Sequence, residues 1–454
     1  MQEKIHLFQT NDIHSHFENW PKIRRWLERK KSYEAQGESV FLFDIGDFLD
    51  REHPLTDVTN GSSNIELMNQ AMYSGVTIGN NEGITNSKEV LNHLYQDANF
   101  PVVLSNLLDK QTQKYPSWLT PTLYLNTKQG TKIGVIGLTA PMTLTYEPFG
   151  WQVLEVDEVL SRLVPQVSHT ADVLILLSHL GLPEDKRIAE KYPEINVIMG
   201  AHTHQLLANG LKINQTILAS SGRFGEYVSD ITIDLFDHKI ANISVDTYNT
   251  MTLDDVDDQK EIKEYYNKGY SLLSQQKICY LDEWLDKEES LITTTLTAMK
   301  EVSHCDVAIV NSGLFLKSFG QGIVTAKDLH DSLPHPMNLI KVTLDGQNLI
   351  RLAKEIEKNK DFLRRFPVVG MKFRGKYFGE IWYDGFEYDA KTKSAYWCGE
   401  LVKKDKSYTF VTVDHLAFLP FFPTIEIAGD ISLLGPKFLR NILGEYLKKK
   451  NQRC

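Results

Sequence analysis

The stretch VLILLSHLG (residues 173–181) decides the fold of the first half of the chain. Its apolar residues run on without the polar alternation of a strand that has one solvated face. Such a run is typical of a strand buried on both faces, in a sheet covered by helices. A polar residue, a histidine and a glycine follow at once. We therefore expect an α/β sheet with His179 at the edge where such sheets bind ligands.

The same pattern recurs across the first 245 residues. A short apolar run is followed by a polar or glycine-containing turn, and often by a helical stretch. The other runs predicted to be strands are residues 5–10, 40–46, 75–79, 101–105, 132–139, 196–200, 216–220 and 228–236. This recurrence predicts an α/β domain.

The composition is that of a folded soluble protein with more than one domain. The 454 residues are 42% hydrophobic and 24% charged, and this length favours two domains. The net charge of −10 argues against a nucleic-acid polymer as partner, because no basic excess can neutralise its backbone. We find no apolar run of membrane-spanning length, no signal-peptide pattern and no closely spaced cysteine pair. A cytoplasmic protein without a membrane partner is expected.

Residues of the types that bind metal ions follow five of the predicted strands, each at the carboxyl end of its strand. They are Asp12, His14, Asp47, Asn80, His179, His202 and His204. Because the carboxyl ends of strands in an α/β sheet line one crevice, these five segments are expected to converge on one site. A single D-x-H or H-x-H element is common by chance, but the shared position after a strand makes the set informative.

The mixture of ligand types indicates which ions the site takes. Four imidazoles, two carboxylates and one carboxamide suit Mn, Zn, Fe or Co better than Ca. Seven ligands exceed the needs of one tetrahedral ion, whereas two ions that share a carboxylate would use them all. Asp47 is the best bridge candidate, since it stands alone after its glycine. Two such ions suit hydrolysis of a phosphate ester by a bridging hydroxide; a two-metal peptidase, whose site usually relies on carboxylates, is the competing class.

The pattern changes after residue 250. Residues 252–300 are rich in acidic and long-chain polar residues, with helical spacing and no strand signal. A linker helix is predicted over residues 251–275. Strand-like runs return at residues 306–313, 339–344 and 407–413, mixed with helical stretches, and they predict a second α/β domain.

Five motifs of the first half resemble the signatures of calcineurin-like metallophosphoesterases. They are DIHSH (12–16), FDIGDFLDR (43–51), GNNEG (79–83), LSHLG (177–181) and GAHTHQ (200–205). The resemblance implies a four-layer α/β/β/α domain, here residues 1–250, with two metal sites. One ion would be held by Asp12, His14, Asp47 and His204, and the other by Asp47, Asn80, His179 and His202.

The second half is similar to the C-terminal domain of the 5′-nucleotidase and 2′,3′-cyclic-nucleotide phosphodiesterase family. The segment DVAIVNSGLFLKSFGQGIVTAKDLHDSLPHPMNL (306–339) carries this resemblance. It implies a smaller α/β domain over residues 276–454 that binds the nucleoside and the far side of the phosphate. The candidate contacts are Asn311, Lys317, Arg365, Phe418 and Phe421, with Arg364 and Arg374 as alternatives for the family's arginine.

One departure from the family concerns catalysis. The family's Asn-His-(Glu/Asp) motif provides a histidine that stabilises the leaving group, whereas this chain has Asn81 followed by Glu82. An amide donates a hydrogen bond but no proton at neutral pH. Asn81 and Asp47 are therefore the predicted catalytic residues, with Asn81 stabilising the developing charge.

The function expected from these observations is hydrolysis of nucleotide-like phosphate esters by a hydroxide that bridges two divalent ions. The alternative is a nucleotide-binding or regulatory protein with little turnover. The sequence leaves the oligomeric state open.

Overall fold

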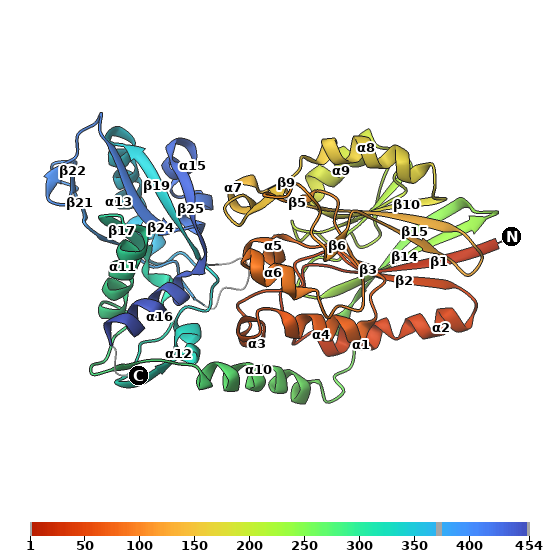
Figure 1. The fold of residues 1–454 in the computed structure, drawn as a ribbon, viewed down its shortest axis with the longest axis horizontal. Helices are drawn as coiled ribbons and strands as arrows, with labels where there is room; N and C mark the ends of the chain where they lie inside the picture. Colours follow the sequence, from red (N-terminus) through yellow and green to blue (C-terminus); the bar gives the residue numbers. More distant parts are fainter. Residues whose placement is uncertain (1, 369–374, 452–454) are drawn as a thin grey trace. The chain divides into compact units, whose positions relative to one another are not determined.

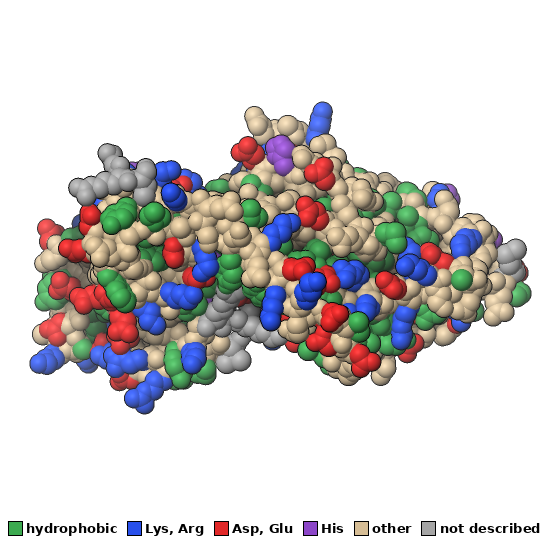
Figure 2. All heavy atoms as spheres, turned by 90° about the horizontal axis from the view of Figure 1, so that it is seen from below, with side chains coloured by type: hydrophobic (Ala, Val, Ile, Leu, Met, Phe, Trp, Pro, Cys, Tyr) green, Lys and Arg blue, Asp and Glu red, His purple; other side chains and the backbone are tan. Residues whose placement is uncertain are grey.

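The chain divides into two compact units, Met1–Gly269 and Tyr270–Cys454, in a computed structural model that describes residues 2–368 and 375–451 (Figure 1). Both units combine helices with β-sheets, so the predicted α/β class is confirmed. Among the described residues, no helix is long and apolar enough to cross a membrane. On the face drawn in Figure 2, acidic and basic side chains are interspersed and no continuous basic surface is visible.

Two sheets form the centre of the N-terminal unit. The first has the strand order β15 (Lys239–Asn249), β14 (Tyr227–Phe236), β1 (Gln2–Thr10), β2 (Ser39–Asp44), β3 (Gly75–Val76), β4 (Val102–Val103) and β6 (Leu119–Thr120). The second has the order β12 (Leu211–Ile213), β13 (Thr216–Ala219), β11 (Val197–Gly200), β10 (Val173–His179), β8 (Lys132–Thr139) and β7 (Thr122–Asn126).

The two sheets pack against each other through apolar side chains such as Leu7 and Phe43 of the first and Ile175 and Met199 of the second. A separate apolar layer joins the second sheet to helices α8 (Val156–Ser168) and α9 (Leu182–Lys191). Helices α1 (Trp20–Leu27), α2 (Arg29–Ala35), α3 (Pro54–Val58) and α4 (Ser62–Ala71) lie on the side of the first sheet (Figure 1). The implied four-layer α/β/β/α arrangement is confirmed.

Parallel pairing brings the predicted ligand segments to the same end of each sheet. Strand β1 pairs in parallel with β2, and β2 with β3. Strand β10 pairs in parallel with β8 and with β11. The short elements α5 (Asn80–Ile84), α6 (Lys88–Leu94), α7 (Thr143–Tyr146), β5 (Leu107–Asp109) and β9 (Trp151–Val153) belong to the connections.

The C-terminal unit has one main sheet, with the strand order β20 (Ile381–Asp384), β17 (Val307–Asn311), β24 (Ser407–Val413), β19 (Asn338–Asp345) and β25 (Asp430–Phe438). Smaller sheets are formed by β16 (Lys277–Leu281) with β18 (Gly322–Thr325), and by β21 (Phe386–Asp389), β22 (Ser394–Trp397) and β23 (Glu400–Leu401). Its helices are α11 (Ser290–Ser303), α12 (Ala326–Ser332), α13 (Gly346–Leu363), α14 (His415–Phe418), α15 (Pro423–Ala428) and α16 (Leu439–Lys450).

The segment after residue 250 differs from its prediction in one respect. Helix α10 runs from Asp258 to Gln275, and strand β16 follows it, although no strand was expected before residue 300. Only two of the five side chains of β16 are buried, so the apolar signal of this strand is weak. The boundary between the two units falls inside α10, after Gly269. A Cβ at Gly269 would clash with the Leu55 backbone nitrogen, so α10 needs glycine for its close approach to helix α3.

A buried histidine of the N-terminal unit contacts two carboxylates. His6 of β1 is 4% exposed, with Nδ1 2.9 Å from Asp230 and Nε2 2.9 Å from Glu38. Burial alone would lower the pKa of His6, but hydrogen bonds to these two carboxylates and their charges outweigh it and raise the pKa.

We expect the stabilisation from charged His6 to be complete below the ordinary pKa of histidine and to be lost as the pH rises through the raised pKa. Denaturant unfolding at a series of pH values should show this loss, on the order of 1 to 3 kcal/mol for the charge-assisted bonds. The His6→Gln variant should lack this part of the pH dependence. Identical pH profiles for the two proteins would contradict the prediction.

Candidate metal centre

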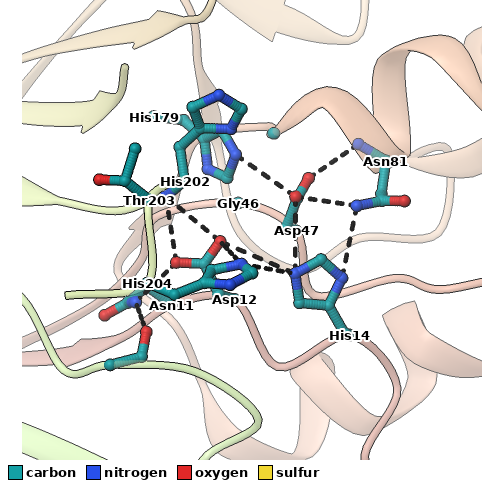
Figure 3. A network of polar contacts seen from close by, with 12 residues as sticks. Asn11, Asp12, His14, Gly46, Asp47, Asn81, His179, His202, Thr203 and His204 are labelled. Atoms are coloured by element: carbon teal, nitrogen blue, oxygen red, sulfur yellow. Dashed lines mark hydrogen bonds and ion pairs between the residues drawn. The ribbon is translucent and has the colours of Figure 1, made fainter. Parts of the chain in front are cut away.

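The structure brings six of the seven predicted ligands together in two groups (Figure 3). The ligand atoms of Asp12, His14 and His204 lie within 4.8 Å of one another, and so do those of Asp47, His179 and His202. In the first group His204 Nε2 is 3.2 Å from His14 Nε2 and 3.5 Å from Asp12 Oδ1. Ligands bound at about 2.0 to 2.2 Å in a tetrahedral shell lie roughly 3.3 Å apart, so this spacing suits one ion.

Asp47 belongs to the second group and also faces a histidine of the first. Its Oδ2 atom is 3.7 Å from His14 Nε2 and 3.4 Å from His179 Nε2. The side chain follows β2 and the tight turn at Gly46. One carboxylate thus faces a histidine of each group, which is the geometry expected of a bridging ligand.

Two buried atoms near Asp47 have no hydrogen-bond partner among the described residues. His179 Nδ1 lies 2.7 Å from the Ile45 carbonyl, so this nitrogen donates and Nε2 is the ring nitrogen that faces Asp47. Both His179 Nε2 and Asn80 Oδ1 are buried without a hydrogen bond in the described part of the chain. A Cβ at Gly79, next to Asn80, would clash with Asp47 Oδ1, so the turn before Asn80 lies very close to the Asp47 carboxylate. Buried nitrogen and oxygen atoms without a hydrogen-bond partner fit ligands of a metal ion.

Five of the seven predicted ligands have left-handed backbone conformations. Their φ angles are 50° for Asp12, 48° for His14, 53° for Asp47, 75° for His202 and 59° for His204. This conformation costs a residue with a side chain about 1 to 2 kcal/mol. Backbone strain of this kind persists where the surrounding structure holds it, and it clusters at functional sites.

Histidines and carboxylates of the two groups shift one another's pKa. Burial alone would lower the pKa of His14, but Asp50, Asp47 and Asp12 raise it to about 9. Burial likewise opposes the charged form of His179, yet its pKa rises to about 10, chiefly because of Asp47. Burial would raise the pKa of Asp47, but the two histidines lower it. The carboxylates therefore retain protons on these histidines, and a divalent ion has to displace those protons to bind.

Asn81, predicted to be catalytic, contacts the carboxylate of Asp47. Its backbone nitrogen donates to Asp47 Oδ1 at 2.7 Å and its Nδ2 donates to Asp47 Oδ2 at 2.8 Å. Nδ2 is also 3.3 Å from His14 Nδ1 (Figure 3). The amide thus holds the carboxylate and a neighbouring imidazole in place.

Comparisons with known proteins assign both halves of the chain to described families. The calcineurin-like phosphoesterase family model matches residues 5–206, and that of the 5′-nucleotidase C-terminal domain matches residues 280–418. The chain is 35% identical to the uncharacterized metallophosphoesterase YunD of Bacillus subtilis, over 98% of this chain and 99% of that protein. The chain belongs to the calcineurin-like metallophosphoesterases. The predicted enzyme class, a metal-dependent hydrolase of phosphate esters, is confirmed.

Other relatives of this metallophosphoesterase are 5′-nucleotidases. The 5′-nucleotidase of Vibrio cholerae is 25% identical over 76% of this chain and 74% of its own length. The NAD nucleotidase NadN of Haemophilus influenzae has a TM-score of 0.68 at 16% identity, covering 99% of this chain and 97% of its own. The 5′-nucleotidase precursor of Thermus thermophilus has a TM-score of 0.59 at 18% identity, with the same coverage of both chains. These two structures share the fold of the metallophosphoesterase.

The predicted substrate contacts of the C-terminal unit differ in their surroundings and in their exposure to solvent. Asn311 is buried and donates to the Phe378 carbonyl at 2.9 Å, and Lys317 pairs with Asp331 at 2.7 Å. Phe421 is partly buried and packs with other phenylalanines, whereas Phe418 is 70% exposed. Arg365 is exposed beyond α13, and Arg374 lies outside the described residues.

The C-terminal unit contains a cavity of about 700 Å³. Its described lining includes Ser312 and Gly313, directly after Asn311, together with Arg364, Tyr377 and Trp382. Arg364 also pairs with Glu380, at 2.7 Å. Neither Tyr377 nor Trp382 was predicted, because an isolated aromatic residue in sequence does not show whether it faces a cavity or the core.

Sequence reasoning also missed residues that support the metal ligands. Asp50 Oδ2 is 3.6 Å from His14 Nδ1, and Asn11 Nδ2 donates to Asp12 Oδ2 at 2.8 Å. Glu82 accepts hydrogen bonds from the backbone nitrogens of Asp47 and Leu49, both at 2.9 Å. Carboxylates and amides of this kind orient metal ligands. All three residues lie inside or beside the quoted motifs, and this proximity was the available signal.

Proposed function

We propose that this metallophosphoesterase hydrolyses nucleotide-type phosphate esters with two divalent ions. One ion would be held by Asp12, His14, Asp47 and His204, and the other by Asp47, Asn80, His179 and His202. The observation that carries the proposal is the position of Asp47 Oδ2, 3.7 Å from one histidine and 3.4 Å from another. When bound, the two ions would supply a hydroxide nucleophile and neutralise phosphate charge.

The chain's own residues prepare the site for this reaction. His179 presents Nε2 because its Nδ1 is bound to a carbonyl. Asn81 holds Asp47 with two hydrogen bonds and cannot supply a proton to a leaving group. We therefore expect faster turnover of esters whose leaving group departs as a stable anion. The 700 Å³ cavity with Trp382 and Arg364 is our candidate for binding the nucleoside.

The test is a substrate panel with each divalent ion. Purified protein with Mn, Co, Zn or Fe is offered nitrophenyl phosphate, nucleoside mono-, di- and triphosphates, cyclic nucleotides and dinucleotides. We expect release of product from nitrophenyl phosphate and from at least one nucleotide, and loss of both activities after chelation. Nucleotide binding without turnover of any panel member would favour the alternative of a regulatory nucleotide-binding protein.

A further inference from the structure

Arg223 lies in a loop that is fastened to the metal-ligand segment on both sides. Before it, the Gly222 carbonyl accepts a hydrogen bond from Asn11 Nδ2 at 2.8 Å. After it, the Phe224 backbone nitrogen donates to the Asp12 carbonyl at 2.7 Å. The backbone at Arg223 is therefore held beside Asp12, and Phe224 adopts a left-handed conformation there, with φ of 61°.

The ring of Phe224 connects Arg223 with the histidines of the site. The guanidinium carbon lies 4.6 Å from the centroid of this fully buried ring. The same centroid is 5.9 Å from that of His14 and 6.3 Å from that of His204. The Phe224 ring thus lies within contact distance of Arg223 and of the predicted ligands His14 and His204. Arg223 is close to the site, but it is not one of the predicted ligands.

Arg223 has no carboxylate partner within ion-pair distance among the residues that the structure describes. Some arginines of the N-terminal unit do have one: Arg24 pairs with Glu261 at 2.8 Å and Arg187 with Asp157 at 3.0 Å. The side chain of Arg223 is half-buried. A guanidinium that rests its face on an aromatic ring keeps its N–H edge available, and this edge matches a phosphate with two parallel hydrogen bonds.

We propose that Arg223 is a specificity-determining residue that binds a second phosphate of the substrate, next to the phosphate that reacts. This inference rests on the proposed function and names its substrate class: phosphoanhydrides such as nucleoside diphosphates. Hydrolysis would break the bond from the reacting phosphorus to the bridging oxygen, the oxygen of a water molecule would take its place, and a proton of that water would pass to solvent. The electron pair leaves on the second phosphate, as a stable anion that needs no proton. The presence of Asn81 at the position of the family's histidine is consistent with such a leaving group.

The experiment measures binding by calorimetry on the full chain loaded with Mn. The probes are the non-hydrolysable α,β-methylene analogue of adenosine diphosphate and inorganic phosphate. Arg223→Ala should weaken binding of the analogue by about 10- to 100-fold, the effect of a charged hydrogen bond, with little change for phosphate. Arg223→Lys should restore part of the loss. Arg29→Ala is the matched control, since Arg29 lies 4.9 Å from the ring of Tyr248.

Two results would overturn the assignment: unchanged affinity for the analogue in Arg223→Ala, or an equal loss of affinity for inorganic phosphate. Metal content and unfolding temperature of each variant establish that it is folded. Turnover of nitrophenyl phosphate by the wild-type protein is measured in parallel. Its absence would count against the proposed function, whereas the ratio of the two affinities tests Arg223 with or without turnover.

Discussion

Replacing Asp47 by asparagine is expected to lower kcat/KM for nitrophenyl phosphate on the order of 10³-fold, the equivalent of about 4 kcal/mol. The substitution keeps the size of the side chain but removes the negative charge that faces both His14 and His179. An amide oxygen carries no negative charge, so it is a much weaker ligand for two divalent ions than a carboxylate oxygen. The measurement is steady-state kinetics with Mn, together with metal content after gel filtration. Bound metal should fall from two ions per chain to one or none.

The control for this substitution is Asp185→Asn. Asp185 is also a buried carboxyl of the N-terminal unit, hydrogen-bonded to Ser178, and burial raises its pKa to about 8. Burial therefore favours the protonated, uncharged form of Asp185, which an amide resembles. We expect this variant to keep its two ions and most of its activity. Equal activity of Asp47→Asn and the wild-type protein would contradict the shared-ligand arrangement.

The fold could be predicted where strands are buried on both faces. The runs at 132–139 and 173–178 correspond to β8 and β10, whose side chains are nearly all buried. Strand β15, Lys239–Asn249, was missed because only one of its eleven residues is buried. An exposed edge strand has no continuous apolar run, and it forms because it pairs along its length with β14.

The candidate site could be located because of a rule that needs no coordinates. Ligand residues that follow parallel strands must meet at one edge, and the strand ends were visible as polar residues after apolar runs. The C-terminal unit offered no such rule. Phe418 and Phe421 are alike in sequence, yet one is 70% exposed and the other packs against Phe366. Which aromatic side chain faces a ligand depends on packing between distant segments.

Replacing Glu82 by glutamine is expected to lower kcat by about 10- to 100-fold, the usual effect of losing a residue that orients metal ligands. The Glu82 carboxylate is fully buried and accepts three backbone hydrogen bonds. The donors are the nitrogens of Asp47 and Leu49, both at 2.9 Å, and that of Gly79 at 2.8 Å. One side chain thus connects the turn that carries Asp47 with the turn that carries Asn80.

Glutamine cannot satisfy these three donors, because its NH₂ group would face at least one N–H. The unpaired group should cost about 1 to 3 kcal/mol of stability and lower the unfolding temperature by several degrees. Glu89→Gln is the matched control, since Glu89 is exposed on the next helix and should change neither quantity.

A purely structural role for Glu82 would lower the unfolding temperature but leave kcat per folded, metal-loaded molecule unchanged. A positioning role predicts that kcat also falls in the folded, metal-loaded protein. The variant should still bind two ions, because all seven ligands remain, and KM should change little, because no substrate contact is removed. The fall should appear in kcat, since Asp47 and Asn80 are then no longer held at the distances that two ions and a shared carboxylate require. Unchanged kcat in a fully metal-loaded Glu82→Gln protein would show that the hydrogen bonds within the two turns are sufficient without this carboxylate.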